Sequence, residues 1–474
     1  MIFFRTISAT LFSLLLACDG PATAVDAGSD AGAAASCPRP SVLVAGSAET
    51  DALASAPARC GQPAHSWLRD PSLGSIVASQ SLTRFSAASL TALVESQGVT
   101  VPEPLRYDTS LASITYVTQD RGDLVEATAL VAWPRGLPED APDPDVVLFL
   151  HGSSGYADGC GPTHDPGSQL LAALLASLGW MVVAPDYLGL RGDGEPTGFP
   201  HPYLVGQATA IASLDAARAV LGMDPSTRAG LCTSGRVLVL GGSQGGHAAL
   251  WVDRLAPYYA RELELVGTVA TVPPADAVSQ IQRALTELVP ATRSSIVFFG
   301  LAPVWYGAGD RLSEVLAPPL DEEATAQLST GCDPGGPYSP STLEEAFAPA
   351  LLDAASRGEL ASFGDFGCMV RESSLVHTSI ARIGPGAPSY AILFVLAEAD
   401  PLVSSAIERS SAEALCAGGA PLSFLECEGA GHLEGTTWAL PEIVEFARAR
   451  FAGEPPGEPC SITAPVRCRG TPGG

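Results

Sequence analysis

Three residues, in the chain order Ser243, Asp400 and His432, could together carry out nucleophilic chemistry. A serine hydroxyl is a weak nucleophile at neutral pH, so it needs a base within hydrogen-bond reach and an acid that orients that base. Ser243 stands in the stretch GGSQG, which fits the pattern G-x-S-x-G of a tight turn between a strand and a helix. We therefore predict that Ser243 is the nucleophile, His432 the base and Asp400 the acid of a Ser-His-Asp triad.

Each member of this triad has an alternative interpretation. The glycines around Ser243 could only relax a turn, and Asp400 could only cap the helix that follows it. His432 could be a surface histidine in a glycine-rich loop, while Glu398 is a competing acid and His377 a competing base. The triad is favoured because all three of its members follow runs typical of strands, and open parallel sheets place reactive groups at the carboxyl ends of their strands.

Ester chemistry at such a serine also needs hydrogen-bond donors for the negative oxygen that develops in the transition state. Loss of one donor typically costs about 3–4 kcal/mol of transition-state stabilisation. One predicted donor is the backbone N–H of Gln244, directly after the predicted nucleophile. The second is the backbone N–H of Ser153, with Ser154 as the alternative, in the loop HGSSG that follows the apolar run at 145–150.

The elements that must position these residues alternate between strand and helix. We expect strands at 114–117, 124–133, 145–150, 180–184, 236–240, 265–272, 391–396 and 422–426, and helices at 170–178, 208–221, 404–417 and 441–451. This alternation predicts an α/β fold with a mostly parallel sheet and helices on both faces. The strand signal is weak between 274 and 388, where we expect helices at 277–288, 295–306, 341–355 and 372–380.

These patterns divide the chain into six predicted segments. They are a signal peptide (1–17), a disordered tether (18–36), the first part of the core (37–273), a helical cap insertion (274–388), the second part of the core (389–452) and a Gly/Pro-rich tail (453–474).

The N-terminus has the pattern of an export signal. Arg5 precedes a short apolar run at 7–17, whereas a membrane-spanning helix needs about 20 apolar residues. The run ends in LLAC, which resembles a bacterial lipobox and would leave Cys18 as a lipidated first residue. We therefore expect an exported protein that associates with a bacterial membrane through a lipid anchor on Cys18. The alternative is an ordinary signal peptide and a secreted protein.

The cysteine count agrees with export. The chain has 11 cysteines, and setting Cys18 aside leaves an even number, enough for five disulfides in an oxidising compartment. Pairing of neighbours in sequence would give Cys37–Cys60, Cys160–Cys232, Cys332–Cys368, Cys416–Cys427 and Cys460–Cys468. The sequence contains no CxxC motif and no His/Cys cluster with ligand spacing, so we expect no metal and no cofactor.

The charge balance excludes one class of partner. The formal net charge is −26, from 51 acidic and 25 basic residues. Nucleic-acid binding depends on basic residues that neutralise phosphates, so no nucleic-acid partner is expected. The sequence does not set the oligomeric state.

Several segments resemble one known family. The stretches VVLFLHG, MVVAPDYLGL, GFPHPYLVGQATAIASLDAARAV and RVLVLGGSQGGHAALW are similar to the secretory lipases, the family of fungal lipase A-like enzymes and their exported bacterial relatives. The similarity is densest over 145–275 and resumes at AILFVLAEADPLV and GAGH. It departs from the family at Gly242, where relatives often carry histidine. The expected cap lies where the family typically has one, but its own sequence resembles no known cap.

The resemblance implies an α/β-hydrolase fold with a helical cap between the nucleophile and the acid. It also implies a triad at Ser243, Asp400 and His432 and an oxyanion donor at Ser153. The expected function is an exported serine hydrolase, a lipase or esterase, that cleaves neutral carboxylic esters through an acyl-enzyme without a cofactor. The alternatives are a peptidase or a polyester or aryl-ester hydrolase on the same fold, or a non-catalytic surface binding module.

Overall fold

The computed structural model describes residues 37, 60–61, 66–383, 391–455 and 457–472. The predicted signal peptide (1–17) and tether (18–36), which include Cys18, lie outside these residues.

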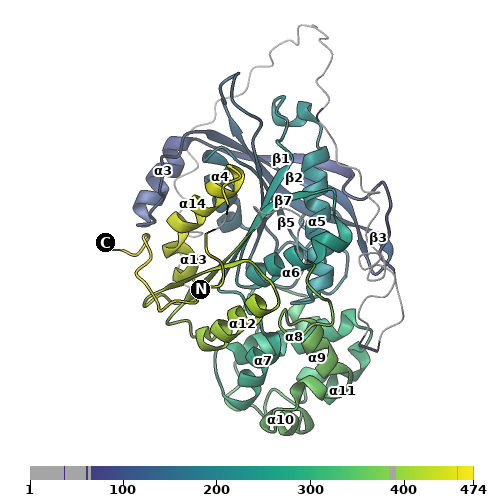
Figure 1. Cartoon of the computed structure of the whole chain (residues 1–474). Coiled ribbons are helices and arrows are strands. Elements are labelled where there is room, and N and C mark those ends of the chain that lie inside the picture. Colours follow the sequence, from purple (N-terminus) through teal and green to yellow (C-terminus); the bar gives the residue numbers. More distant parts are fainter. Residues whose placement is uncertain (1–36, 38–59, 62–65, 384–390, 456, 473–474) are drawn as a thin grey trace.

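A single nine-stranded sheet forms the centre of the described chain (Figure 1). Its order is β1-β2-β3-β5-β4-β6-β7-β8-β9. The strands are β1 (Ile76–Phe85), β2 (Asp108–Asp120), β3 (Asp123–Arg135), β4 (Val146–Leu150), β5 (Met181–Pro185), β6 (Arg236–Gly242), β7 (Glu264–Thr271), β8 (Ile392–Ala397) and β9 (Leu422–Cys427). The first three strands and the contact of β3 with β5 are antiparallel, and all pairs from β5 to β9 are parallel. The predicted mostly parallel sheet is confirmed, with β1 as the one strand that was not predicted.

Helices cover both faces of this sheet. Helices α5 (Gly206–Gly222) and α6 (Gln244–Tyr259) lie on one face, and α4 (Pro166–Ser177) and α14 (Leu440–Phe451) lie on the other (Figure 1). Successive side chains of β4 enter the two cores alternately, with Leu148 on the α5–α6 side and Val147 on the α4–α14 side. Both faces of β4 are therefore buried, which explains its continuous run of apolar residues.

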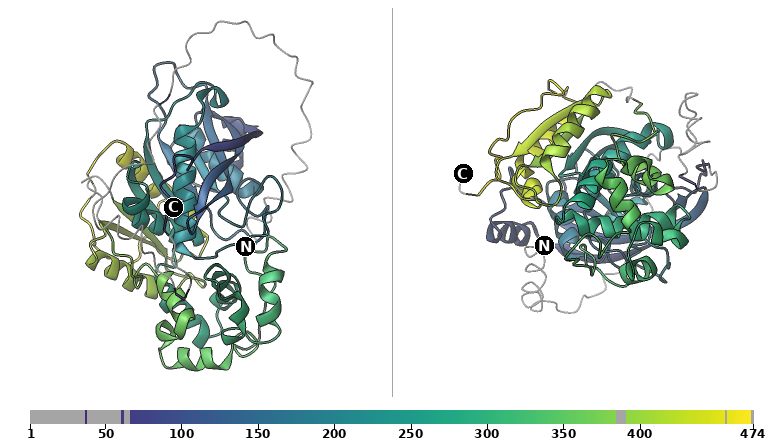
Figure 2. Two further views of the ribbon diagram at one scale, coloured as in Figure 1. Left: turned by 90° about the vertical axis from the view of Figure 1, so that its right-hand side faces the viewer. Right: turned by 90° about the horizontal axis from the view of Figure 1, so that it is seen from below.

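The chain between β7 and β8 forms a separate group of helices. They are α7 (Ala277–Thr286), α8 (Ala291–Trp305), α9 (Leu320–Leu328), α10 (Pro349–Ser356) and α11 (Gly364–Glu372). Short 3-10 turns lie between α8 and α9 and between α10 and α11. In both views of Figure 2 these helices, coloured teal-green to green, gather together, and in the left view they lie at the lower end of the molecule. Among the described residues, no single helix has the length and apolar character to span a membrane, and only α7 with α8, bent by 114°, passes that test as a pair.

Two of the helices expected in this segment are wrong. The helix expected at 341–355 begins only at Pro349, because proline cannot donate the backbone hydrogen bond that an interior helical position requires. The helix expected at 372–380 is a turn, and α11 ends at Glu372. The Glu372 carboxylate accepts hydrogen bonds from Thr378 and Ser379, which requires the chain to fold back after the helix. Helices α9 and α11 were not predicted.

All ten cysteines among the described residues form disulfides, as expected, but the predicted pairing is wrong at every bond. The observed pairs are Cys37–Cys232, Cys60–Cys368, Cys160–Cys332, Cys416–Cys460 and Cys427–Cys468. Their sequence separations range from 41 to 308, because a disulfide needs Cα atoms that lie close together in the fold, here 5.2–5.7 Å apart, whatever their distance along the chain.

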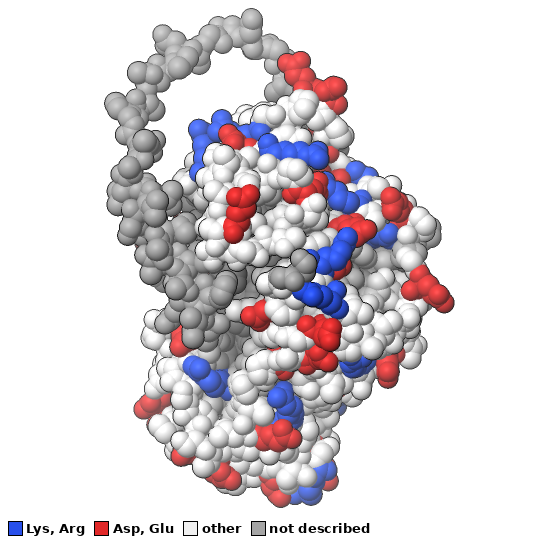
Figure 3. Space-filling view, turned by 90° about the vertical axis from the view of Figure 1, so that its left-hand side faces the viewer, with Lys and Arg blue, Asp and Glu red and all other residues white. Residues whose placement is uncertain are grey.

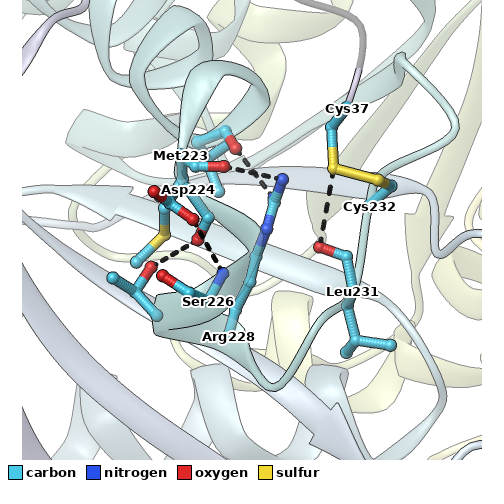
Figure 4. The surroundings of a disulfide bond; sticks show 9 residues. Cys37, Met223, Asp224, Ser226, Arg228, Leu231 and Cys232 are labelled. Carbon is cyan, nitrogen blue, oxygen red and sulfur yellow. Dashed lines mark hydrogen bonds between the residues drawn. A yellow bond between two sulfur atoms is a disulfide. The ribbon is translucent and has the colours of Figure 1, made fainter. Parts of the chain in front are cut away.

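The Cys37–Cys232 bond lies beside the end of α5, as Figure 4 shows. There the buried guanidinium of Arg228 donates hydrogen bonds to the carbonyl oxygens of Val220, at 3.0 Å, and Met223, at 2.9 Å. The Met223 N–H also donates to the Val220 carbonyl, at 3.3 Å, so Arg228 adds side-chain hydrogen bonds to the carbonyl groups at the end of α5, next to the disulfide.

The C-terminal segment covers the edge of the sheet. Its two cysteines are bonded to α12 (Ser405–Ala417) and to the end of β9, and Val466 exchanges backbone hydrogen bonds with Glu426 and Glu428, the residues on either side of Cys427. An uncovered edge strand can pair with another chain, so this segment protects β9. Acidic and basic side chains are interspersed over the face in Figure 3.

Candidate active site

Ser243 lies in the predicted turn between β6 and α6, in a strained backbone conformation. Its φ is 58° and its ψ is −120°, which is unusual for a residue other than glycine. Its N–H donates to the carbonyl of Thr271 at 2.9 Å, and its own carbonyl accepts from His247 at 3.0 Å. A Cβ on Gly245 would lie 1.9 Å from the carbonyl oxygen of Leu150, so only glycine allows α6 to approach β4 this closely.

Two hydrogen bonds join the three residues predicted for the triad. His432 Nε2 lies 2.9 Å from Ser243 Oγ, and His432 Nδ1 lies 2.6 Å from Asp400 Oδ2. The Asp400 side chain is 2% exposed and that of His432 is 15% exposed. With Nδ1 donating to the carboxylate, Nε2 is free to accept the serine proton. The structure thus brings together the three groups that proton abstraction from a serine hydroxyl requires.

The loop after β8 holds the Asp400 carboxylate in place. Oδ2 faces His432, and Oδ1 accepts the backbone N–H groups of Leu402, at 2.8 Å, and Val403, at 2.9 Å. These bonds leave the carboxylate little freedom to rotate away from the imidazole.

The two competing residues lie elsewhere. The Glu398 carboxylate accepts the backbone N–H of Gly429 at 2.8 Å. His377 Nε2 lies 3.4 Å from Asp276 Oδ1, in the segment between β7 and β8. Within the part of the chain that the structure describes, neither forms a hydrogen bond with Ser243 or His432.

The loop after β4 lies against the turn that carries Ser243. A Cβ added to Gly152 would lie 3.3 Å from the carbonyl oxygen of Gly242 and 3.6 Å from Ser243 Cβ. The Ser153 hydroxyl shares a hydrogen bond with Tyr203 OH at 3.1 Å. The loop that carries the predicted donor Ser153 is therefore next to the serine.

The other predicted donor, Gln244, is the first residue of α6. Backbone N–H groups in the first turn of a helix have no partner within the helix, so they can point at a negative group. The Gln244 side chain makes a different contact, because its Nε2 donates to His201 Nε2 at 2.8 Å. His201 Nδ1 in turn donates to the carbonyl of Leu188 at 2.7 Å.

Buried polar residues support these two loops. Burial lowers the pKa of both His151 and His201 to about 4, so both imidazoles are neutral at neutral pH. The rings of His151 and Tyr187 stack with centroids 4.2 Å apart. Burial raises the pKa of Asp186 to about 7, against hydrogen bonds from Thr128 and Thr163 that lower it. These groups position the backbone around the site, and the two neutral histidines bring no charge to it.

The described residues contain no group of three or more His, Cys, Asp or Glu side chains that could hold a metal ion.

Comparison with known proteins identifies relatives of this chain. The family model described as "Secretory lipase" matches residues 166–459. A secreted triacylglycerol lipase of Malassezia globosa is 27% identical over 301 residues, which cover 62% of this chain and 58% of that protein. A probable inactive lipase of Mycobacterium tuberculosis is 26% identical over 292 residues, which cover 60% of this chain and 58% of that protein. The chain thus matches less than two thirds of the length of these relatives.

Solved structures share the fold at low sequence identity. The rice cell wall degrading esterase LipA from Xanthomonas oryzae superposes with a TM-score of 0.62 at 19% identity, covering 81% of this chain and 98% of that one. Candida antarctica lipase A in its closed state superposes with a TM-score of 0.62 at 17% identity, covering 83% of this chain and 86% of that one. The expected α/β-hydrolase fold is confirmed.

Proposed function

This chain belongs to the secretory lipase family, to whose model residues 166–459 match, and from that premise we propose that it is an exported serine hydrolase of carboxylic esters. The observation that carries the proposal is the pair of hydrogen bonds from Asp400 through His432 to Ser243. One relative is a probable inactive lipase, so family membership alone leaves catalysis open, and the proposal depends on these side chains.

The proposed reaction proceeds in two halves. His432 Nε2 accepts the Ser243 proton while Oγ attacks the carbonyl carbon of the ester, and the backbone N–H groups of Gln244 and Ser153 stabilise the oxyanion. The C–O bond to the alcohol then breaks, and His432 returns the proton to the departing oxygen. In the second half, His432 deprotonates a water molecule that attacks the acyl-enzyme. The bond from the acyl carbon to Ser243 Oγ then breaks, His432 returns the proton to Oγ, and the carboxylic acid is released. Asp400 holds the imidazole tautomer and stabilises the imidazolium throughout.

We further propose that the chain is divided into the six segments expected from the sequence. In this division residues 274–388 form a cap that selects the acyl group. The helices α7 to α11 fall within this segment, between the turn that carries Ser243 and the loop that carries Asp400. No step of the proposed reaction requires a cofactor. The expected substrates are neutral carboxylic esters.

Export and a lipid anchor on Cys18 complete the proposal. Secreted relatives and five disulfides support export, because such bonds persist in oxidising compartments. Replacement of Cys18 by serine should move the protein from the membrane fraction to the soluble fraction of the cell envelope. An unchanged distribution would contradict the anchor and leave the ester hydrolase untouched.

The decisive experiment is hydrolysis of nitrophenyl esters from acetate to palmitate by wild type and variants. Ser243→Ala and His432→Ala should each lower kcat by roughly 10⁴-fold or more while the thermal unfolding midpoint stays unchanged. Asp400→Asn should lower kcat strongly, whereas Glu398→Gln, its matched control two residues away, should not. Wild-type activity in either of the first two variants would overturn the triad.

The same assay separates the alternatives. Activity that rises with acyl length indicates a lipase, and a maximum at acetate or butyrate indicates a short-chain esterase. Serine-dependent cleavage of peptides, polyesters or aryl esters in preference to all of these would favour the other hydrolases. The absence of serine-dependent turnover on every substrate would favour a binding module.

A further inference from the structure

Helix α7 contacts the loop that carries Asp400 through a pair of reciprocal hydrogen bonds. Gln280 Oε1 accepts the backbone N–H of Ser404 at 3.2 Å, and Gln280 Nε2 donates to the backbone carbonyl of Ser404 at 3.3 Å. Gln280 is 6% exposed. Because its amide pairs with both backbone groups of one residue, it holds that residue in a defined orientation. An amide side chain is suited to this contact, because it can donate and accept together.

A second residue on the same side of α7 contacts the same loop. Arg283, three residues after Gln280, donates at 3.5 Å to the carbonyl of Leu402 and at 3.4 Å to the carbonyl of Pro401. Residues three apart lie on one face of a helix, so this face of α7 follows the turn 401–404. The turn is thus held by α7 from outside and by the Asp400 carboxylate from within.

Gln280 is itself held by a buried acid on α12. Its Nε2 also donates to Glu408 Oε1 at 2.9 Å, and the same carboxylate accepts the backbone N–H groups of Ala275 at 3.1 Å and Asp276 at 3.4 Å. Glu408 is fully buried. Glu408, on α12, therefore binds both the start of α7 and the Gln280 amide. The two helices lie next to each other in Figure 1.

We infer that Gln280 is a positioning residue for Asp400, through which the first helix of the segment between β7 and β8 sets the direction of the carboxylate toward His432. This inference rests on the proposed function. Catalytic groups must be held within about 0.5 Å of their productive geometry, and a bond of 2.6 Å between Asp400 and His432 leaves little tolerance. Loss of the amide loosens the turn 401–404, which then keeps only the weaker Arg283 contacts with α7 and whose Leu402 and Val403 N–H groups hold the other carboxylate oxygen.

The test compares two glutamines on one helix. Gln280→Met keeps the length of the side chain and removes both hydrogen bonds to Ser404 together with the one to Glu408. The matched control is Gln282→Met, because the Gln282 amide donates to the carbonyl of Ala355, away from the Asp400 loop. The readouts are kcat and KM on nitrophenyl butyrate, per active site titrated with a phosphonate that labels the serine.

We expect Gln280→Met to lower kcat by about 10- to 30-fold with KM within about twofold, and Gln282→Met to change either value by less than about twofold. In an Asp400→Asn background, Gln280→Met should lower kcat by less than about twofold further, because the direction of the acid no longer matters. The same factor in both backgrounds would overturn the inference, since a residue with only a structural role acts independently of Asp400.

Two further outcomes keep the inference separate from the proposed function. Full activity of Ser243→Ala would overturn the proposed function itself. An inactive Ser243→Ala together with a Gln280→Met that matches the Gln282 control would overturn this inference alone. If Gln280→Met does not fold, Gln280→Ala replaces it with the same expectations, because it also removes both hydrogen bonds to Ser404 and places no new charge beside the buried Glu408.

Discussion

Replacement of Gly152 by alanine should slow the chemical step without unfolding the protein. The added Cβ would lie 3.3 Å from the Gly242 carbonyl oxygen, closer than about nine in ten Cβ contacts, so the two loops must separate by a few tenths of an ångström. The backbone of Gly152 lies outside the positive-φ region, so alanine itself is not strained there. The movement carries the backbone N–H of Ser153 away from the position of the oxyanion.

The size of the effect follows from the value of one oxyanion donor. Complete loss of such a donor typically costs about 3–4 kcal/mol, and a shift of a few tenths of an ångström weakens the bond without removing it. We expect about half of that cost, which corresponds to a fall of roughly 10- to 30-fold in kcat. The KM should change little, because the donor binds the developing oxyanion more strongly than the ground-state carbonyl.

The assay is steady-state hydrolysis of nitrophenyl butyrate alongside thermal unfolding. Gly457→Ala is the control, since a Cβ there would meet no atom within 4 Å and its backbone is also outside the positive-φ region. An unchanged kcat in Gly152→Ala would refute the placement of the donor in this loop. A fall in kcat matched by a fall in the folded fraction would refute the argument that the change is local.

Three further predictions concern the framework of the site. Gly245→Ala should give little soluble folded protein, because its Cβ would meet the Leu150 carbonyl oxygen at 1.9 Å, and a folded, active variant by circular dichroism would contradict that close approach. Replacement of both Cys160 and Cys332 by serine opens a bridge of sequence separation 172, so the free energy of unfolding in urea should fall by up to about 5 kcal/mol, and an unchanged urea midpoint would count against it. Burial lowers the pKa of His247 from 6.5 to about 4, so its stabilising contribution is complete above pH 6.5 and is lost as the pH falls toward 4. Between about pH 8 and pH 5 wild type should therefore lose roughly 2 kcal/mol more unfolding free energy than His247→Gln, and parallel pH profiles would show that the imidazole does not titrate in this way.

The parts of the fold that could be predicted are those with a local signal. Strands β4 to β8 are short buried runs of mostly apolar residues, and such a run can be recognised from its composition. Strand β1 lies at the edge with most of its side chains exposed, so IVASQSLTRF lacks that signal. The helix predicted at 341–355 begins later, at Pro349. The apolar spacing continues across Pro349, but proline has no backbone N–H for a hydrogen bond inside a helix.

The disulfide pairing could not be predicted, because it has no local signal in the sequence. Export and an even number of cysteines predict that the cysteines are paired. The residues next to a cysteine do not identify its partner. Cys160 follows β4, and Cys332 lies beyond α9 in a segment whose helices were themselves only partly predicted. The pairing depends on how that segment packs against the core, so no rule of sequence proximity could have found it.

The proposed triad and its support differ in the same way. Ser243, Asp400 and His432 could be located because each follows a strand, and the carboxyl ends of parallel strands meet at one edge of a sheet whatever the intervening chain does. Gln280 has no such signal, because it is one glutamine in an amphipathic helix and its partner, the backbone of Ser404, lies 124 residues later. The direction of the acid would then depend on how α7 packs against α12. Exchange of the segment between β7 and β8 for that of a relative would accordingly change the support of Asp400 together with the substrate site, and kcat would respond as well as acyl preference.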